Sequence, residues 1–195
     1  MAIAFVLGNG QSRTHINLVQ LQQLGPIYGC NALYRDWEPD CLVATDRPIA
    51  EAIQRSGYAK KHRFYTRKPL PDLGALTVPR KYHGNSSGPI ACAIAAGDGH
   101  DRIYLLGYDM GPTANMRFNN VYAGTEFYKG ADAAPTFTGN WIRQLVTIAG
   151  DFPKTQFIRV CGPTSAVIKE FEMIKNFENL DIKLFCHRLD TNDGL

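Results

Sequence analysis

Short apolar runs alternate along this chain with stretches of helical spacing. The run at 3–7 contains no polar residue, and such a run predicts a strand buried on both faces of a parallel sheet. Comparable runs predict further strands, at 27–30, 41–45, 61–66, 102–107, 157–161 and 182–185. Apolar spacing and capping residues predict helices, at 12–24, 46–56, 86–96, 141–149 and 166–177. The alternation predicts an α/β fold with a mostly parallel, doubly wound sheet and helices on both faces.

Polar residues follow several of these predicted strands. Asn9 comes after the first strand, Asn31 after the second and Asp46 after the third, and Asp109 follows a later one. The stretch Ser86-Ser87-Gly88 opens a helix of small residues. Ligands of doubly wound sheets bind beyond the carboxyl ends of the strands. These residues therefore predict one ligand site at that edge of the sheet.

The turn Gly8-Asn9-Gly10-Gln11-Ser12 admits two interpretations. Glycines let the backbone turn sharply and come close to a ligand, and Ser12 stands where a helix N-cap is expected. A glycine turn at a helix N-terminus exposes unpaired N–H groups, which can hold an anion. However, the turn lacks the third glycine of the dinucleotide fingerprint and the Gly-Lys-Ser/Thr of a P-loop. It can equally be an ordinary tight connection between a strand and a helix.

The composition is that of an ordinary globular protein. With 195 residues, 45% of them hydrophobic, the chain can build one sizeable core, so we expect a single domain over residues 1–195. The net charge of +3 does not indicate a nucleic-acid partner, but it suits an anionic small molecule. The five cysteines form no Cys-x-x-Cys pair, and no apolar run has the length of a membrane span. We therefore expect a cytoplasmic protein with reduced cysteines.

Sequence motifs for metal binding and for hydrolase chemistry are missing. The chain has no His-x-His, His-Glu-x-x-His or Asp-x-Asp pair, so we expect no metal ion. It also lacks the Gly-x-Ser-x-Gly turn that carries the nucleophile of α/β-hydrolases.

The stretch from 110 to 138 is rich in Gly, Asn, Thr, Tyr and Phe and shows no periodicity. Connections of this length in compact domains are usually functional or disordered. We predict that it forms a lid over the ligand site, in which Arg117, Tyr122, Tyr128 and Lys129 grip an anionic ligand after closure. The same side chains can equally be surface residues.

Several of these motifs occur together in one known family. The sequence resembles the bacterial α-2,3/α-2,8-sialyltransferases of glycosyltransferase family 42 at Gly8-Asn9-Gly10-Gln11-Ser12, Cys30-Asn31-Ala32-Leu33-Tyr34, Ser86-Ser87-Gly88, Cys92-Ala93-Ile94-Ala95 and Ile103-Tyr104-Leu105-Leu106-Gly107-Tyr108-Asp109. It also resembles the related motility-accessory-factor and 6-hydroxymethylpterin diphosphokinase-like proteins. Order and spacing match from residue 3 to 109, and a weaker match continues from 157 to 171.

The resemblance implies a Rossmann-like variant of the GT-A fold that uses a CMP-activated sugar without a metal ion. In the family, the glycine turn, the asparagine after the second strand and the helix start hold the nucleotide. The corresponding residues here, with Ser12 and Ser86 added as their neighbours, are Gly8, Asn9, Gly10, Ser12, Asn31, Ser86, Ser87 and Gly88. An asparagine that assists them is replaced by Asp46, which can accept hydrogen bonds but cannot donate with an amide.

The sequence departs from the family at the chemical step. The family's general-base histidine is replaced by Asn140, and an amide cannot take the proton of an acceptor hydroxyl. The tyrosines that hold the departing phosphate have no secure counterpart, although Tyr122 or Tyr128 could serve from the loop. The remaining candidates for the base are His83, Asp46 and Asp109. Each also has a plain structural interpretation: a solvated loop residue, a helix cap and a turn residue.

We therefore expect a metal-independent, inverting, sialyltransferase-like enzyme with a CMP-sugar donor and a sugar-bearing acceptor. Assembly into a homo-oligomer is compatible with this expectation, and no cofactor is implied. Two rival interpretations stay open. One is pyrophosphate transfer of the pterin diphosphokinase kind, and the other is a nucleotide-binding protein without catalysis, because of Asn140.

Overall fold

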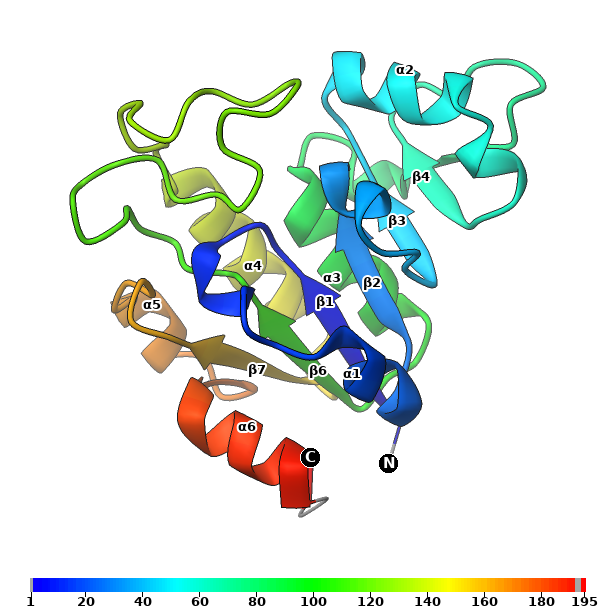
Figure 1. Ribbon diagram of the computed structural model, residues 1–195. Coiled ribbons are helices and arrows are strands. Elements are labelled where there is room, and N and C mark those ends of the chain that lie inside the picture. Colours follow the sequence, from blue (N-terminus) through cyan, green and yellow to red (C-terminus); the bar gives the residue numbers. More distant parts are fainter. Residues whose placement is uncertain (1, 192–193) are drawn as a thin grey trace.

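The computed structural model describes residues 2–191 and 194–195. In these residues, eight strands form one sheet, and all neighbouring strands run parallel (Figure 1). The order across the sheet is β5-β4-β3-β2-β1-β6-β7-β8. The strands are β1 (Ile3–Leu7), β2 (Ile27–Cys30), β3 (Cys41–Val43), β4 (Phe64–Thr66), β5 (Leu76–Thr77), β6 (Arg102–Leu106), β7 (Gln156–Cys161) and β8 (Phe177–Asp181). The strand order reverses at β1, as in a doubly wound sheet, so the predicted fold class is confirmed.

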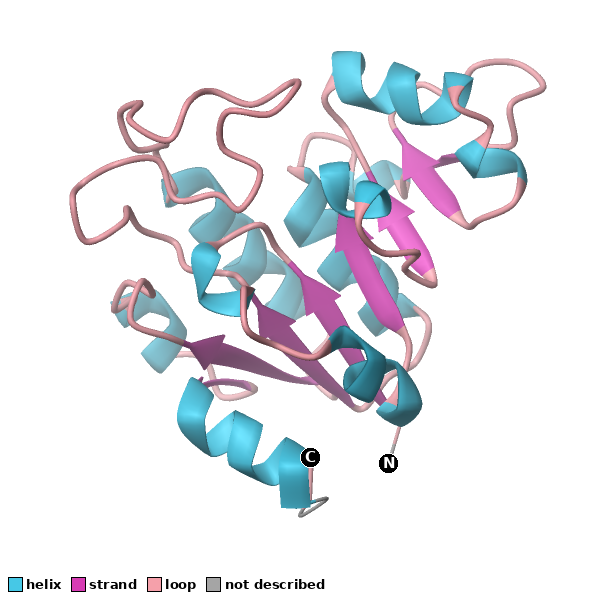
Figure 2. Cartoon of the chain, in the orientation of Figure 1, coloured by secondary structure: helices cyan, strands magenta, loops and turns pink. Residues whose placement is uncertain are grey.

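Helices cover both faces of the sheet (Figure 2). They are α1 (Leu18–Leu24), α2 (Arg47–Arg55), α3 (Ser87–Gly97), α4 (Gly139–Asp151), α5 (Lys169–Glu172) and α6 (Ile182–Thr191). One core lies between the sheet and α3, α4 and α5, and a second lies between the sheet and α1, α2 and α6. In β1, Ala4 and Val6 face the first core, while Phe5 and Leu7 face the second. This burial on both faces explains why β1 is apolar throughout.

The first helix begins later than the sequence predicts. Ser12 lies in a 3-10 turn, and α1 starts at Leu18, because the side chain of Asn17 caps it by accepting from the N–H groups of Val19 and Gln20. The helix ends at Gly25, as predicted. Consequently the glycine turn after β1 leads into a 3-10 turn, and the N-terminus of α1 comes several residues later.

The C-terminal elements also differ from the prediction. The helix expected at 166–177 is reduced to the single turn α5, and the strand expected at 182–185 is the start of α6. The last strand is β8, which pairs with β7. Asp181 ends the strand and turns the chain into α6, since its carboxylate accepts from the N–H groups of Lys183 and Leu184.

The connection between β6 and α4 is the long loop that the sequence predicts. Residues 107–138 contain no helix or strand, and they lie beyond the carboxyl ends of the central strands (Figure 1). A second connection, at 69–79, contains the two-residue edge strand β5. In the part of the chain that the structure describes, no helix is long and apolar enough to cross a membrane.

Candidate functional site

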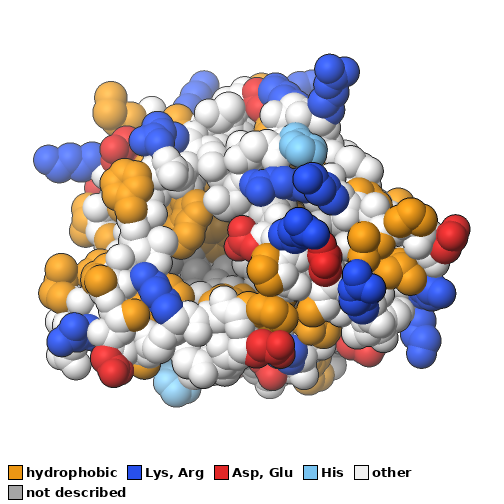
Figure 3. All heavy atoms as spheres, turned by 90° about the horizontal axis from the view of Figure 1, so that it is seen from above, with side chains coloured by type: hydrophobic (Ala, Val, Ile, Leu, Met, Phe, Trp, Pro, Cys, Tyr) orange, Lys and Arg blue, Asp and Glu red, His pale blue; other side chains and the backbone are white. Residues whose placement is uncertain are grey.

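A cavity of about 350 Å³ opens at the carboxyl ends of the strands. Seen from above, the surface is hollowed at its centre (Figure 3). The cavity is lined by the ends of β1, β2, β3 and β6, the start of α3 and part of the 107–138 loop. The predicted site residues that line it are Gly8, Asn9, Gly10, Asn31, Asp46, Ser86, Ser87, Gly88, Asp109 and Tyr128. Ser12, His83, Arg117, Tyr122 and Asn140 do not line it.

Asn9 and Asn31 form one side of the cavity, which we call the acceptor wall. Asn9 follows β1 and Asn31 follows the adjacent β2. The Oδ1 atoms of both residues are buried and accept no hydrogen bond from any described residue. The orientation of Asn9 is set by its amide N–H group, which donates to the hydroxyl of Tyr128 at 3.4 Å. Because a buried acceptor without a partner is costly, these oxygens favour a ligand that supplies O–H or N–H groups.

The start of α3 forms another side of the cavity, and this side is rich in hydrogen-bond donors. The hydroxyl of Ser87 accepts from the backbone N–H of Thr45 at 3.0 Å, and that of Ser86 accepts from the indole of Trp141 at 3.0 Å. The positive end of the helix dipole faces the cavity, and Arg67 and Lys129 also line it. A helix N-terminus in a cavity that is also lined by two cations favours an anionic group such as a phosphate. We call this side the donor end.

The glycine turn after β1 is used for close packing. The backbone N–H of Gly8 donates to the carbonyl of Leu106, and that of Gly10 donates to the carbonyl of Gly107, each at 2.8 Å. A Cβ atom on Gly8 would lie 2.6 Å from that Gly107 oxygen, so only glycine fits. The next two N–H groups, of Gln11 and Ser12, donate to side chains. The turn is therefore packed as a tight strand connection, in which these four N–H groups are bonded within the protein.

Asp109 is 3% exposed and its carboxylate is fully engaged. One oxygen accepts from the hydroxyls of Ser12 and Ser165. The other accepts from the N–H of Ser12 at 3.1 Å, the amide of Asn119 at 3.0 Å and the hydroxyl of Thr164 at 2.7 Å. A carboxylate has about four lone-pair positions. With five donors around it, Asp109 has none left for the proton of a substrate.

The other two predicted catalytic residues lie away from the cavity. His83 is exposed after a 3-10 turn, and its carbonyl accepts from the side chain of Arg67 at 2.8 Å. Asn140 is exposed and lines a separate cavity of about 180 Å³, where its amide oxygen accepts from Arg143. At the start of α4 it is Trp141 that faces the main cavity.

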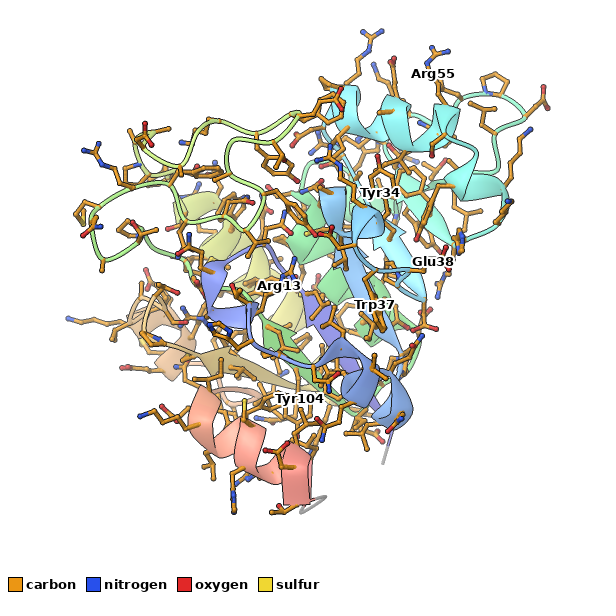
Figure 4. All side chains as sticks on the ribbon, viewed as in Figure 1. Arg13, Tyr34, Trp37, Glu38, Arg55 and Tyr104 are labelled. Atoms are coloured by element: carbon orange, nitrogen blue, oxygen red, sulfur yellow. The ribbon has the colours of Figure 1, made fainter. Side chains whose placement is uncertain are left out.

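The predicted lid residues Arg117, Tyr122 and Tyr128 occupy different positions. Tyr128 lines the cavity, and its hydroxyl accepts from Asn9 and from the N–H of Ala32 at 3.3 Å. Tyr122 is buried outside the cavity and accepts from Arg13, which lies beside the β1 turn (Figure 4). Arg117 is exposed and donates to a loop carbonyl. Burial raises the pKa of Tyr128, so its hydroxyl keeps a proton that it can donate to a ligand.

Sequence reasoning missed Arg67 and Trp141 among the residues of the cavity, whereas Lys129, which it named in the lid, lines the cavity. Arg67 directly follows β4, so the rule that strand ends line the ligand site could have identified it. Cys30 also lines the cavity, but burial raises the pKa of its thiol to about 12, so it is not a thiolate at neutral pH.

Asp46 combines two features that distinguish it from the other candidates for the base. It lines the cavity, and it stands at the N-cap position of α2 without making a side-chain cap hydrogen bond. Its side chain is exposed and forms no hydrogen bond to any described residue. The carboxylate is therefore free to meet a ligand. No group of three or more His, Cys, Asp or Glu side chains that could hold a metal ion occurs among residues 2–191 and 194–195.

Comparison with known proteins identified a solved structure with a similar fold. No family model and no curated protein matches this sequence. Among solved structures, the fold is similar to the sialyltransferase CstII from Campylobacter jejuni, which was determined in complex with a substrate analogue, cytidine-5′-monophosphate. The TM-score is 0.56 at 14% sequence identity, and the match covers 92% of this chain and 85% of that one. At this identity the likeness shows the fold, so the chain has a sialyltransferase-like, Rossmann-like α/β fold.

Proposed function

We propose that this protein is a sialyltransferase-like glycosyltransferase that uses a CMP-activated sugar as donor. The observation that carries the proposal is the polarity of the cavity. Its acceptor wall, Asn9 and Asn31, suits the hydroxyls of a ribose or the amino group of a base, and its donor end suits a phosphate. A nucleotide supplies both kinds of group in one small molecule. The fold similarity to a sialyltransferase solved with a cytidine nucleotide supports the choice of CMP.

Tyr128 supports a role for the 107–138 loop as a lid of the donor site. Its hydroxyl accepts two hydrogen bonds, from Asn9 and Ala32, and it retains its own proton. In the proposed complex, the hydroxyl uses that proton for a hydrogen bond to the nucleotide at the acceptor wall, beside Asn9. The loop then encloses the nucleotide, which lies between Tyr128 and the donor end. A GT-A variant fold with a metal-independent, inverting reaction completes the proposal.

Asp46 is the residue that we propose as the general base. Asp109 is saturated, and His83 and Asn140 lie outside the cavity. Asp46 is the one predicted candidate that both lines the cavity and keeps a free carboxylate. A carboxylate can accept the proton of an acceptor hydroxyl in the transition state, an effect worth about 10²–10⁴-fold in rate.

Titration calorimetry tests nucleotide binding, with CMP, UMP, ADP and ATP compared in the presence and absence of Mg²⁺. The proposal expects CMP to bind best and Mg²⁺ to have no effect. Preference for ATP with a requirement for Mg²⁺ would instead favour pyrophosphate transfer of the pterin diphosphokinase kind. Failure of all four nucleotides to bind contradicts the proposal.

Turnover of a CMP-sugar tests the chemical step, with Asp46→Asn as the variant. The amide keeps the size and one acceptor oxygen, so CMP affinity should stay within about threefold while turnover falls about 100-fold or more. Asp72→Asn is the control, because Asp72 is exposed and does not line the cavity. Undiminished turnover by Asp46→Asn would exclude Asp46 as the base.

A nucleotide-binding protein without catalysis is the second candidate function. The observation that favours it is that no histidine lines the cavity. CMP binding by the wild-type protein, without release of CMP from CMP-sugars over a range of acceptors, would select this candidate.

A further inference from the structure

The carboxylate of Asp109 gathers three chain segments that are far apart in the sequence. Ser12 belongs to the turn after β1, Asn119 to a later part of the 107–138 loop, at whose start Asp109 itself lies, and Thr164 and Ser165 to the turn between β7 and α5. All four side chains, and one backbone N–H, donate to the two oxygens of this one residue. None of these segments is part of a helix packed on the sheet or of a strand. The bonds to Asp109 therefore contribute to their relative positions.

The backbone of Asp109 is fixed from the opposite side by Arg159, which lies in β7 and is 1% exposed. Its guanidinium donates to the carbonyl of Tyr108 at 2.7 Å and to the carbonyl of Asp109 at 2.8 Å. It also donates to the carbonyl of Ala166 at 2.9 Å. A planar guanidinium suits several acceptors at fixed angles. Arg159 thus holds the end of β6 in one geometry, with the carboxylate directed into the three segments.

Asn119 extends this arrangement to the cavity. Its amide N–H group donates to Asp109, while its amide oxygen accepts from the N–H of Gln11 at 2.9 Å. Two residues further on, the N–H of Val121 donates to the carbonyl of Asn9 at 2.8 Å. The loop is therefore attached to the same turn that presents Asn9 to the acceptor wall. Release of Asn119 from Asp109 would loosen both the loop and Asn9.

We propose that Asp109 is a positioning residue that holds the β1 turn, the 107–138 loop and the β7–α5 turn together as one wall of the nucleotide cavity. It acts on the ligand through Asn119 and Asn9, and it does not exchange a proton with the substrate. The part of the proposal that concerns ligand affinity rests on the proposed nucleotide function. The part that concerns the loop is independent of it.

Asp109→Ala and Asp109→Asn, each in the full chain, separate positioning from catalysis. Alanine removes every bond to the three segments. Asparagine keeps an acceptor for the fixed donors of Ser12 and Asn119, and its NH₂ group faces the hydroxyls of Ser12 and Ser165, which can rotate to accept. We expect Asp109→Ala to weaken CMP binding about tenfold, and Asp109→Asn to stay within about threefold of wild type in both binding and CMP-sugar turnover. A catalytic carboxylate would lose turnover equally in both variants.

Hydrogen exchange reports on the loop whether or not CMP binds. We expect Asp109→Ala to speed amide exchange in residues 113–130 by about tenfold or more while the central strands stay protected. Asp98→Ala is the matched control, because Asp98 accepts from Arg63 and Tyr28 but lies at the other end of the sheet. It should leave exchange in the loop unchanged. If Asp109→Ala does not fold, Asn119→Ala removes the loop's own bond to Asp109, together with its bonds to Gly111 and Gln11, and should give the same local change.

Three possible results bear on whether Asp109 is a positioning residue. Unchanged loop exchange in both Asp109→Ala and Asn119→Ala overturns the inference. Loss of turnover in Asp109→Asn with wild-type CMP affinity also overturns it, because that result assigns Asp109 to the chemistry. If wild-type protein binds no nucleotide, the proposed function fails, while faster loop exchange in the variants still supports the positioning role.

Discussion

Two aspartates at opposite ends of the sheet organise polar clusters, and they do so with different partners. Asp98, at the end of α3, accepts two hydrogen bonds from Arg63 and one from the hydroxyl of Tyr28. Its side chain is 28% exposed, and its main partner is a cation. Asp109, at the opposite end, is 3% exposed, and all its donors are neutral groups from turns and a loop.

The difference shows how one kind of residue serves two ends of an α/β fold. At the amino ends of the strands, Asp98 joins β2, the start of β4 and α3, elements that are already packed into the first core. At the carboxyl ends, Asp109 joins segments without a core of their own. We therefore expect Asp98 to contribute mainly to global stability, and Asp109 mainly to the shape of the cavity.

The largest expected effect on stability comes from Asp98→Ala. The substitution leaves Arg63 and the hydroxyl of Tyr28 without their carboxylate partner, which should lower the free energy of unfolding by about 2 kcal/mol. Urea denaturation measures the change, and calorimetry should show CMP affinity within about twofold of wild type. Tyr28→Phe, which removes one of the bonds, should have a smaller effect of the same sign. A loss of CMP affinity in Asp98→Ala would contradict the division of roles between Asp98 and Asp109 at the two ends of the sheet.

The next largest effect is expected on ligand binding at the carboxyl ends of the strands. Asn31→Ala removes one oxygen of the acceptor wall and should weaken CMP binding about tenfold. Asn140→Ala is the matched control, since it deletes an asparagine amide outside the cavity. Calorimetry on both variants should show the loss only in the first. Equal affinities for the two variants would mean that Asn31 does not meet the nucleotide.

A smaller effect is expected from Thr164, which donates one of the bonds to Asp109. Thr164→Val keeps the shape and removes the hydroxyl, so stability should fall by about 1 kcal/mol. Exchange in the turn between β7 and α5 should rise at the same time. Thr164→Ser keeps the donor and serves as the control. If serine and valine behave alike, the loss belongs to packing of the methyl group.

The smallest effect is on the pH dependence of stability, again through Asp98. Burial raises the pKa of this carboxyl, but hydrogen bonds from Arg63 and Tyr28 outweigh it, so the pKa is lowered overall. The stabilisation is therefore fully present above the pKa of an unfolded aspartate, about 3.9, and is lost as the pH falls through the lower folded value. Denaturation measured between pH 6 and about pH 3 should show a shallower acid loss in Asp98→Asn than in wild type. Parallel curves would assign the acid loss to other groups.

The sequence predicts the fold well where burial leaves one choice. In β1 the apolar run can only be a strand buried on both faces, and the small residues of α3 between Ser86 and Gly97 can only be a closely packed helix. The prediction of where a helix begins fails where a single capping side chain sets its first residue. Asn17 rather than Ser12 starts the first helix, and Asp181 starts α6 where a strand was expected. Both depend on one side chain bonding to local N–H groups, which apolar periodicity does not record.

The candidate site could be located from the sequence, but its chemistry could not be assigned. Strand ends identify Asn9, Asn31 and Asp46, because the fold class alone brings these positions together. The same rule cannot show that Asp109 is saturated, since its donors Asn119 and Thr164 come from segments without periodicity. Sequence spacing likewise does not reveal that Asn140 faces away from the cavity.

Binding of CMP to the wild-type protein is the measurement that tests this account most directly. Titration calorimetry on Asn31→Ala and Asn140→Ala in parallel shows whether the heat of CMP binding depends on the acceptor wall. We expect saturable binding of one CMP per chain, weakened by Asn31→Ala and unchanged by Asn140→Ala. Absence of binding, or binding that neither Asn31→Ala nor Asp109→Ala weakens, would contradict the assignment of the cavity as a nucleotide site.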